Sequence, residues 1–162
     1  MTTKIVTLED YTDNKIVHSS PRTTIEVYFD GLCQPVNPGG TACFAFIIKN
    51  GHNTIHSEYG LAAHNSTNNV AEYTALIRAL EWLLANDYEN KKVIVRGDSQ
   101  LVIRQIERNF KVKAATIIPL YRKAISLISK FKHIQFELIP RDLNKEADRL
   151  SNLAYQEHRL GV

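Results

Sequence analysis

The order of the apolar patterns constrains the fold of this chain more than any other feature. Three runs rich in β-branched and aromatic residues come first, and Asn50-Gly51 between the second and third is a strong tight-turn signal. The runs cover residues 24–30, 41–49 and 54–61. We expect three strands in an antiparallel meander, and we interpret Asp30-Gly31 as a turn that ends the first strand.

Beyond residue 61 the pattern changes to helices that alternate with short strands. Apolar residues at spacings of three and four predict the helices, and brief apolar runs predict the strands. The helices fall at about 69–86, 101–106, 117–130 and 144–156, and the strands at 92–96 and 134–139. Because the fourth and fifth strands are reached through helices, they can lie parallel to the first. The sequence therefore predicts an α/β fold with a mixed sheet covered by helices.

Length and composition favour one ordinary domain. The chain has 162 residues with 44% hydrophobic and 23% charged residues, and its net charge of +3 is too weak to diagnose a nucleic-acid partner. Residues 1–22 precede the first predicted strand, and we treat them as an N-terminal extension of unknown role that could add a hairpin. No signal peptide or membrane-spanning run is evident, so we expect a cytoplasmic protein without a membrane partner.

The cysteines and histidines do not form a recognisable metal site. Cys33 and Cys43 lack the number and spacing of a zinc site or a disulfide framework, and no two of the six histidines form a helical His-x-x-x-His pair. We therefore expect free thiols, and any metal ion must be held by oxygen ligands.

Four acidic residues lie at the ends of predicted elements, and each has an ordinary structural explanation. They are Asp30, Glu72, Asp98 and Asp148. Asp30 can open a turn, and Glu72 can complete a capping box if Asn69 is the N-cap. Asp98 can satisfy free amides at a helix start. Asp148 can lie on a solvated helix face four residues after the predicted N-cap Asn144.

Taken together, the same acids indicate a metal site. Asp30 and Asp98 fall at the carboxyl ends of two strands that can be parallel neighbours, and Glu72 and Asp148 begin helices that can approach that edge. Carboxylates at one point repel unless cations balance them, and oxygen ligands suit magnesium or manganese. Two such ions about 3.5–4 Å apart support in-line displacement at phosphorus, so phosphodiester hydrolysis is the predicted reaction class.

Four segments, in the family's order, resemble the motifs of type 1 ribonucleases H. They are YFDGLCQPVNPGG, STNNVAEYTALIRAL, GDSQLVIRQI and IPRDLNKEADRLSNLA, the last with its acid in an Asn-x-x-x-Asp pattern. The resemblance covers the chain from about Thr24 to Tyr155 and is most similar to the short, archaeal-like members. It implies a ribonuclease H-like fold of five strands in the order 3-2-1-4-5, with the catalytic domain at residues 23–162.

The resemblance also implies an activity and a role for each acid. The enzyme would hydrolyse the RNA strand of RNA/DNA hybrids, with duplex RNA as a further candidate substrate. It would use two Mg²⁺ ions per site, or Mn²⁺ as a substitute, and leave 5′-phosphate and 3′-hydroxyl ends. Asp30 would bridge both ions, Asp148 would complete the site that holds the nucleophilic water, and Glu72 with Asp98 would hold the ion near the leaving 3′-oxygen.

Further residues match the positions where the family contacts its substrate. Asn68, Asn69 and Gln100 match positions that reach the minor groove, where amides can bond 2′-hydroxyls, although capping and turn formation also explain them. The backbone near Gly31 and Cys33 would approach the RNA because little bulk stands there.

The chain departs from many members at two places. A long basic insertion is replaced by a short segment with Lys111 and Lys113, which follow Arg104 and Arg108 and could instead form a solvated face. Arg141 stands where many members carry a histidine. It cannot act as a general base because arginine stays protonated, so its expected role is electrostatic. Pairing with Asp142, Glu146 or solvent is the alternative.

Two rival functions are compatible with parts of this pattern. A 3′–5′ exonuclease of the same fold would normally read Asp-x-Glu on the first strand, where this chain has Asp30-Gly31-Leu32. A non-catalytic module that binds hybrids or duplex RNA would be suggested by loss of an acid, and all four are present. We therefore expect an enzyme, and a monomer by default.

Overall fold

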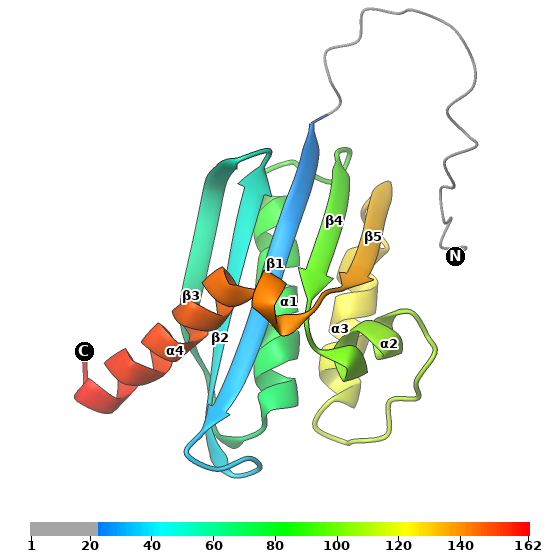
Figure 1. Ribbon diagram of the computed structural model, residues 1–162. Coiled ribbons are helices and arrows are strands. Elements are labelled where there is room, and N and C mark those ends of the chain that lie inside the picture. Colours follow the sequence, from blue (N-terminus) through cyan, green and yellow to red (C-terminus); the bar gives the residue numbers. More distant parts are fainter. Residues whose placement is uncertain (1–22) are drawn as a thin grey trace, which may run out of the picture.

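A five-stranded mixed sheet organises the computed structural model, which describes residues 23–162 (Figure 1). The strands are β1 (Thr24–Gln34), β2 (Gly40–Asn50), β3 (Asn53–Ser66), β4 (Lys92–Gly97) and β5 (His133–Leu138). The first three are antiparallel, β4 is parallel to β1, and β5 is parallel to β4. The order β3-β2-β1-β4-β5 confirms the predicted fold. The hairpin considered for residues 1–22 lies outside the described residues.

Helices cover both faces of the sheet. They are α1 (Asn68–Ala85), α2 (Gln100–Ile106), α3 (Ile118–Ile128) and α4 (Lys145–Leu160), and a 3₁₀ turn, η2 (Arg141–Leu143), leads into α4. Figure 1 shows α1 and α3 behind the sheet and α4 in front of it. Among residues 23–162, no helix is long and apolar enough to cross a membrane.

The alternation of side chains along β1 divides the core into two parts. Val27 and Phe29 point to the α1 side and are fully buried in the larger cluster, together with Leu76 of α1. On the other face, α4 packs a smaller apolar patch against β2. Its buried members are Ala45, Ile47, Ala147 and Leu150. This packing places the start of α4 over the β1 strand.

Strand β1 does not end at Asp30-Gly31, so the predicted turn is wrong. The strand continues to Gln34 and stays paired with β2 throughout, with Asp30 opposite Ala45. The glycine serves packing instead, since a Cβ built at Gly31 would lie 2.4 Å from the backbone nitrogen of Glu72. Gly31 thus allows α1 to approach β1 backbone to backbone.

The start of α1 also differs from the prediction. Thr67, not Asn69, is the N-cap, and its Oγ1 accepts a hydrogen bond from the Val70 amide at 3.2 Å. The reason is that β3 continues to Ser66, so the helix begins directly after the strand. Glu72 is therefore the fifth helical residue, beyond the position from which a glutamate can complete a capping box.

Candidate active site

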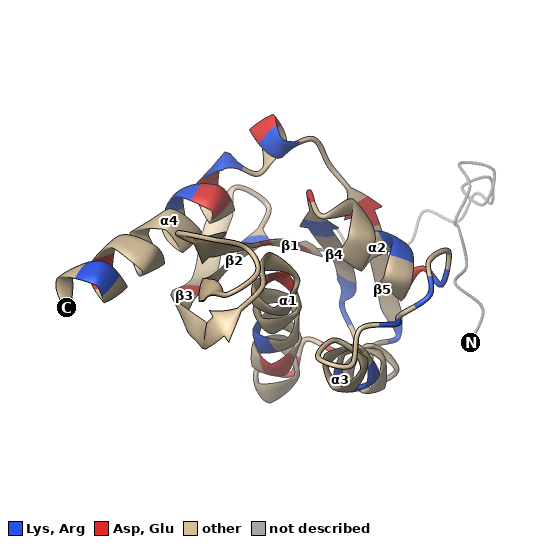
Figure 2. Ribbon diagram, turned by 90° about the horizontal axis from the view of Figure 1, so that it is seen from below, with Lys and Arg blue, Asp and Glu red and all other residues tan. Residues whose placement is uncertain are grey.

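The carboxyl ends of β1 and β4 bring Asp30 and Asp98 to the same level. The parallel register of the two strands ends with Phe29 opposite Gly97, and each aspartate is the next residue. Figure 2 looks onto this edge of the sheet. Glu72 joins them from α1, and one carboxylate oxygen from each of the three residues lies within 4.8 Å of the others. The structure thus brings three of the four predicted acids to ligand distance.

These three carboxyl groups carry more negative charge than the protein balances. Asp30 and Glu72 are only 5% and 6% exposed, and Glu72 Oε2 is buried without a hydrogen-bond partner among the described residues. Burial, then the charges of Asp98 and Asp148, raises the pKa of Asp30 to about 7. Burial, then Asp30 and Asp98, raises the pKa of Glu72 well above its ordinary value. A divalent cation would relieve both effects.

Asp148 lies near this cluster but outside the set of three. It is half-buried on α4, and Asn152 Nδ2 donates to its Oδ1 at 3.3 Å. Its charge contributes to the raised pKa of Asp30, after burial and Asp98. Ser151 connects the two acids, because its Oγ lies 3.1 Å from Asp30 Oδ2 and 2.9 Å from the Asp148 carbonyl oxygen.

Neither Glu72 nor Asp98 is needed as a helix cap. Thr67 caps α1, and Ser99 caps α2 by accepting from the Val102 amide at 3.3 Å. The structural explanations that the sequence offered for these two acids are thereby removed. Burying carboxylates without such a task is costly, and that cost indicates a functional site.

Arg141 is the cation that the sequence singled out for this site. It lines the same cleft as Asp30, Glu72 and Asp98. Burial raises the pKa of Asp98, and the Arg141 guanidinium opposes that shift. Within residues 23–162 it forms no ion pair with Asp142 or Glu146, and Glu146 pairs instead with Lys49 at 2.9 Å.

The predicted substrate contacts divide into two groups. Gly31, Asn68 and Gln100 line the cleft beside the acids. Asn69 and Cys33 do not line it, and the Cys33 thiol is buried and donates to the carbonyl of Val36 at 3.2 Å.

The basic pair lies on the segment between α2 and α3, where Figure 2 shows several basic positions. Lys111 and Lys113 are exposed there and do not line the cleft. Arg104, which precedes them on α2, is partly neutralised by Glu107 at 2.9 Å. The structure therefore leaves the two lysines accessible to a phosphate backbone that extends beyond the acids.

Sequence reasoning missed three residues that organise the site. Asn37 exchanges two hydrogen bonds with Asn68, from its Nδ2 to Asn68 Oδ1 at 2.8 Å and from the Asn68 amide to its Oδ1 at 3.1 Å. Ser151 contacts Asp30, and Asn144 donates to the Phe29 carbonyl at 2.9 Å. For Ser151 the only available signal was a polar residue on an otherwise apolar helix face, which is weak evidence, and the loop residue Asn37 and the N-cap residue Asn144 carried no such signal.

The chain is similar in sequence to a known protein family and to several known proteins. The family model described as "Reverse transcriptase-like" matches residues 28–154. The bifunctional protein Rv2228c of Mycobacterium tuberculosis is 37% identical over 116 residues, covering 72% of this chain and 31% of that protein. Ribonuclease HI of Halobacterium salinarum is 34% identical over 133 residues, covering 82% of this chain and 65% of that one. The chain thus spans less than two thirds of the length of these curated relatives.

Solved structures agree in sequence and in fold. The N-terminal RNase H domain of Rv2228c, solved as a fusion protein, superposes with a TM-score of 0.77 at 30% identity, covering 86% of this chain and 98% of that one. LC11-RNase H1, isolated from compost, has been solved in complex with an RNA/DNA hybrid. That structure superposes with a TM-score of 0.74 at 34% identity, covering 83% of this chain and 98% of that one.

Proposed function

Because the chain belongs to the type 1 ribonuclease H family, we propose that it hydrolyses the RNA strand of RNA/DNA hybrids and leaves 5′-phosphate and 3′-hydroxyl ends. The observation that carries the proposal is the meeting of Asp30, Glu72 and Asp98 at one edge of the sheet. The hybrid-bound structure of LC11-RNase H1 supports the choice of substrate.

The donor set fits divalent metal ions. It consists of carboxylate oxygens only, two of its members are buried, and Glu72 Oε2 has no partner among the described residues. Oxygen ligands of this kind suit Mg²⁺, with Mn²⁺ as a substitute. Two such ions, when bound, would activate a water molecule and stabilise both oxygens of an in-line displacement at phosphorus.

Each acid has a distinct task in this proposal. Asp30, at the centre of the cluster, would serve both ions. Asp98 and Glu72 would hold the ion on the side of the leaving 3′-oxygen, and Asp148 would complete the site on the side of the attacking water. Arg141 would place a fixed positive charge beside the scissile or departing phosphate, for which the guanidinium fork is well shaped.

Recognition of the RNA strand would rest on amides in the cleft. Asn68 and Gln100 line it and can bond 2′-hydroxyls, which distinguish RNA from DNA. Asn69 and the backbone near Gly31 and Cys33 are further candidate contacts. Lys111 and Lys113 would contact phosphates beyond the cleft, without reading sequence.

Cleavage of end-labelled substrates tests this function. RNA/DNA hybrid, duplex RNA and duplex DNA of one sequence are each incubated with Mg²⁺, with Mn²⁺ or with a chelator. We expect cleavage of the hybrid's RNA strand only when metal is present, with 3′-hydroxyl products. Binding of the hybrid without cleavage under every metal condition would identify a non-catalytic binding module instead. Cleavage of duplex RNA would broaden the substrate class without changing the reaction.

A further inference from the structure

Asn144 is the buried residue at which the elements of the acidic site meet. It is 1% exposed, and its Nδ2 donates to the Phe29 carbonyl at 2.9 Å. Its amide N–H donates to the Arg141 carbonyl at 3.0 Å, and its own carbonyl accepts from the Asp148 amide at 3.0 Å. One residue therefore joins β1, η2 and α4 beside three of the predicted functional residues.

The side chain of Asn144 does not perform the capping task that its position suggests. It is the N-cap of α4, yet it makes no side-chain capping hydrogen bond. Its Oδ1 has no partner among the described residues, whereas its Nδ2 is used. An N-cap asparagine normally works through its oxygen. Here the donor, not the acceptor, fixes the orientation of the amide.

The Asn144 side-chain amide donates its hydrogen bond at the point where the pairing of β1 with β4 ends. The register of these strands ends at Phe29 and Gly97, so the backbone after Phe29 has no partner in β4. The Asn144 amide donates to the Phe29 carbonyl there, one residue before Asp30. The start of α4, with Asp148 in its first turn, is thus tied to the backbone that carries Asp30 through a single side chain.

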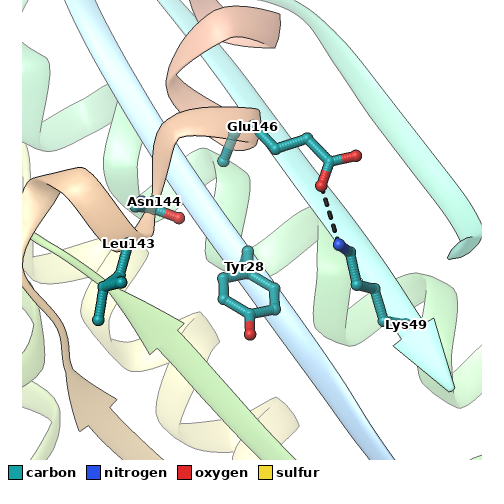
Figure 3. Close-up of a pocket in the computed structure, with 6 residues that line it drawn as sticks. Tyr28, Lys49, Leu143, Asn144 and Glu146 are labelled. Atoms are coloured by element: carbon teal, nitrogen blue, oxygen red, sulfur yellow. Dashed lines mark ion pairs between the residues drawn. The ribbon is translucent and has the colours of Figure 1, made fainter. Parts of the chain in front are cut away.

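The other side of Asn144 faces a small pocket that is separate from the cleft. Figure 3 shows Asn144 between Leu143 and Tyr28, with the Lys49–Glu146 ion pair, 2.9 Å long, at the far side. This ion pair ties the start of α4 to β2 without touching the Asn144 donor. It therefore offers a control that loosens the same helix end and leaves the amide in place.

We propose that Asn144 is a positioning residue, whose amide holds the start of α4 against β1 so that Asp148 and Asp30 bind a divalent cation together. The inference rests on the proposed function only for its catalytic measurement. Side chains that orient the ligands of a metal typically contribute about 10- to 100-fold to metal affinity or activity. The same range is expected for Asn144.

The experiment compares Asn144→Ala and Asn144→Ser with Lys49→Met. Mg²⁺ affinity of the free protein is measured by isothermal titration calorimetry, stability by urea unfolding, and turnover of the hybrid at saturating Mg²⁺. We expect both Asn144 variants to bind Mg²⁺ about 10- to 100-fold more weakly and to lose turnover by a similar factor, with a nearly unchanged KM for the hybrid. Lys49→Met should lose stability but keep Mg²⁺ affinity and turnover within about twofold.

Three results would overturn the proposal. A folded Asn144 variant with Mg²⁺ affinity within twofold of wild type would show that the amide does not position the ligands. Equal losses of affinity in Lys49→Met would assign the effect to a loosened α4. Failure of both Asn144 variants to fold would make the residue purely structural. If the wild-type protein binds Mg²⁺ but leaves the hybrid intact, the proposed function fails and the affinity comparison still decides the role of Asn144.

Discussion

Two charged clusters built on the same strands differ in how their charge is balanced. In the first, Arg96 of β4 lies between Glu26 of β1 and Glu137 of β5, with contacts of 3.1 Å and 2.7 Å. In the second, Asp30, Glu72 and Asp98 meet without an ion-pair partner in residues 23–162. The first cluster is balanced within the fold, and the second is able to hold a cation from outside.

The difference separates structural from functional charge. An arginine between two carboxylates satisfies all three groups, and the arrangement needs no ligand. Three carboxylates together raise one another's pKa and make the metal-free fold less stable than a neutral core would be. A cluster of carboxylates that makes the metal-free fold less stable is explained by a function in binding a cation. The predictions below test this distinction, from the largest expected effect to the smallest.

The largest effect is expected from Asp30→Asn. Turnover of the hybrid should fall by roughly three orders of magnitude or more, because the residue would serve both ions, while hybrid binding survives. Glu26→Gln, in the balanced cluster, is the matched control and should stay within about twofold of wild type. Single-turnover cleavage and filter binding separate the two quantities. Near-normal turnover in Asp30→Asn would remove this residue from the mechanism.

Arg141→Ala should give the next largest loss. Deleting one charge-stabilising donor typically lowers turnover about 10- to 1000-fold, and we expect a value in that range. The pH–rate curve should keep its shape, since arginine does not titrate in the measured range. Turnover within a factor of two of wild type would return Arg141 to the role of a solvated loop residue. A new limb near pH 6.5 would reveal an unrecognised titrating group.

The same Asp30→Asn change should stabilise the metal-free protein at alkaline pH. The folded pKa of Asp30, about 7, lies above the ordinary value of 3.8, so the folded state retains a proton that the unfolded state releases. The wild-type free energy of unfolding should therefore fall as pH rises from about 4 to 7. Asn carries no such dependence, and the variant should gain on the order of 4 kcal/mol at pH 8 and little at pH 4. Urea unfolding with a chelator measures both, and equal gains at the two pH values would contradict the assignment.

Replacing Lys111 and Lys113 together by alanine should produce a moderate effect on binding. The Michaelis constant for the hybrid should rise several-fold, more than turnover falls, because phosphate contacts are made equally in the ground and transition states. For each lysine that binds a phosphate, the substitution should reduce the slope of log affinity against log salt by about 1. An unchanged slope would mean that the phosphates are bound elsewhere.

The smallest effect on activity is expected from Arg96→Met. This change leaves Glu26 and Glu137 without their shared partner, so the protein should lose on the order of 1 kcal/mol of stability. Added Mg²⁺ should not restore that loss, and turnover of the folded enzyme should stay within about threefold of wild type. Restoration by Mg²⁺ would show that the balanced cluster can also bind metal, and the comparison between the two clusters would fail.

Local patterns predicted the order of helices and strands, and the strand order 3-2-1-4-5 was implied by the resemblance to type 1 ribonucleases H. Its errors occurred where a local signal had two possible causes. Asp30-Gly31 has the composition of a turn, yet Gly31 is there for the approach of α1. Thr67 lies two residues before the predicted cap Asn69. It is the N-cap because β3 continues to Ser66 and the helix begins directly after the strand.

The supporting residues of the site could not have been predicted from local patterns. Ser151 and its partner Asp30 are 121 residues apart, and Asn144 and Phe29 are 115 residues apart. No periodicity connects positions so distant in the chain. Only the packing of α4 across the sheet creates these contacts, and a single sequence does not show that packing.

The close approach at Gly31 has a consequence for how the proposed activity could be lost. The distance between Asp30 on β1 and Glu72 on α1 depends on how closely the two backbones approach each other. Gly31, which has no side chain, allows that approach. A methyl group at position 31 would act as a spacer that moves Glu72 away from Asp30, and every acid would remain in the sequence. Such a protein would keep its full set of ligands in the sequence, yet the ligands would no longer lie at the same distances from one another. An intact set of acidic motifs is therefore not sufficient evidence of an active enzyme, and the residue at position 31 must be inspected with them.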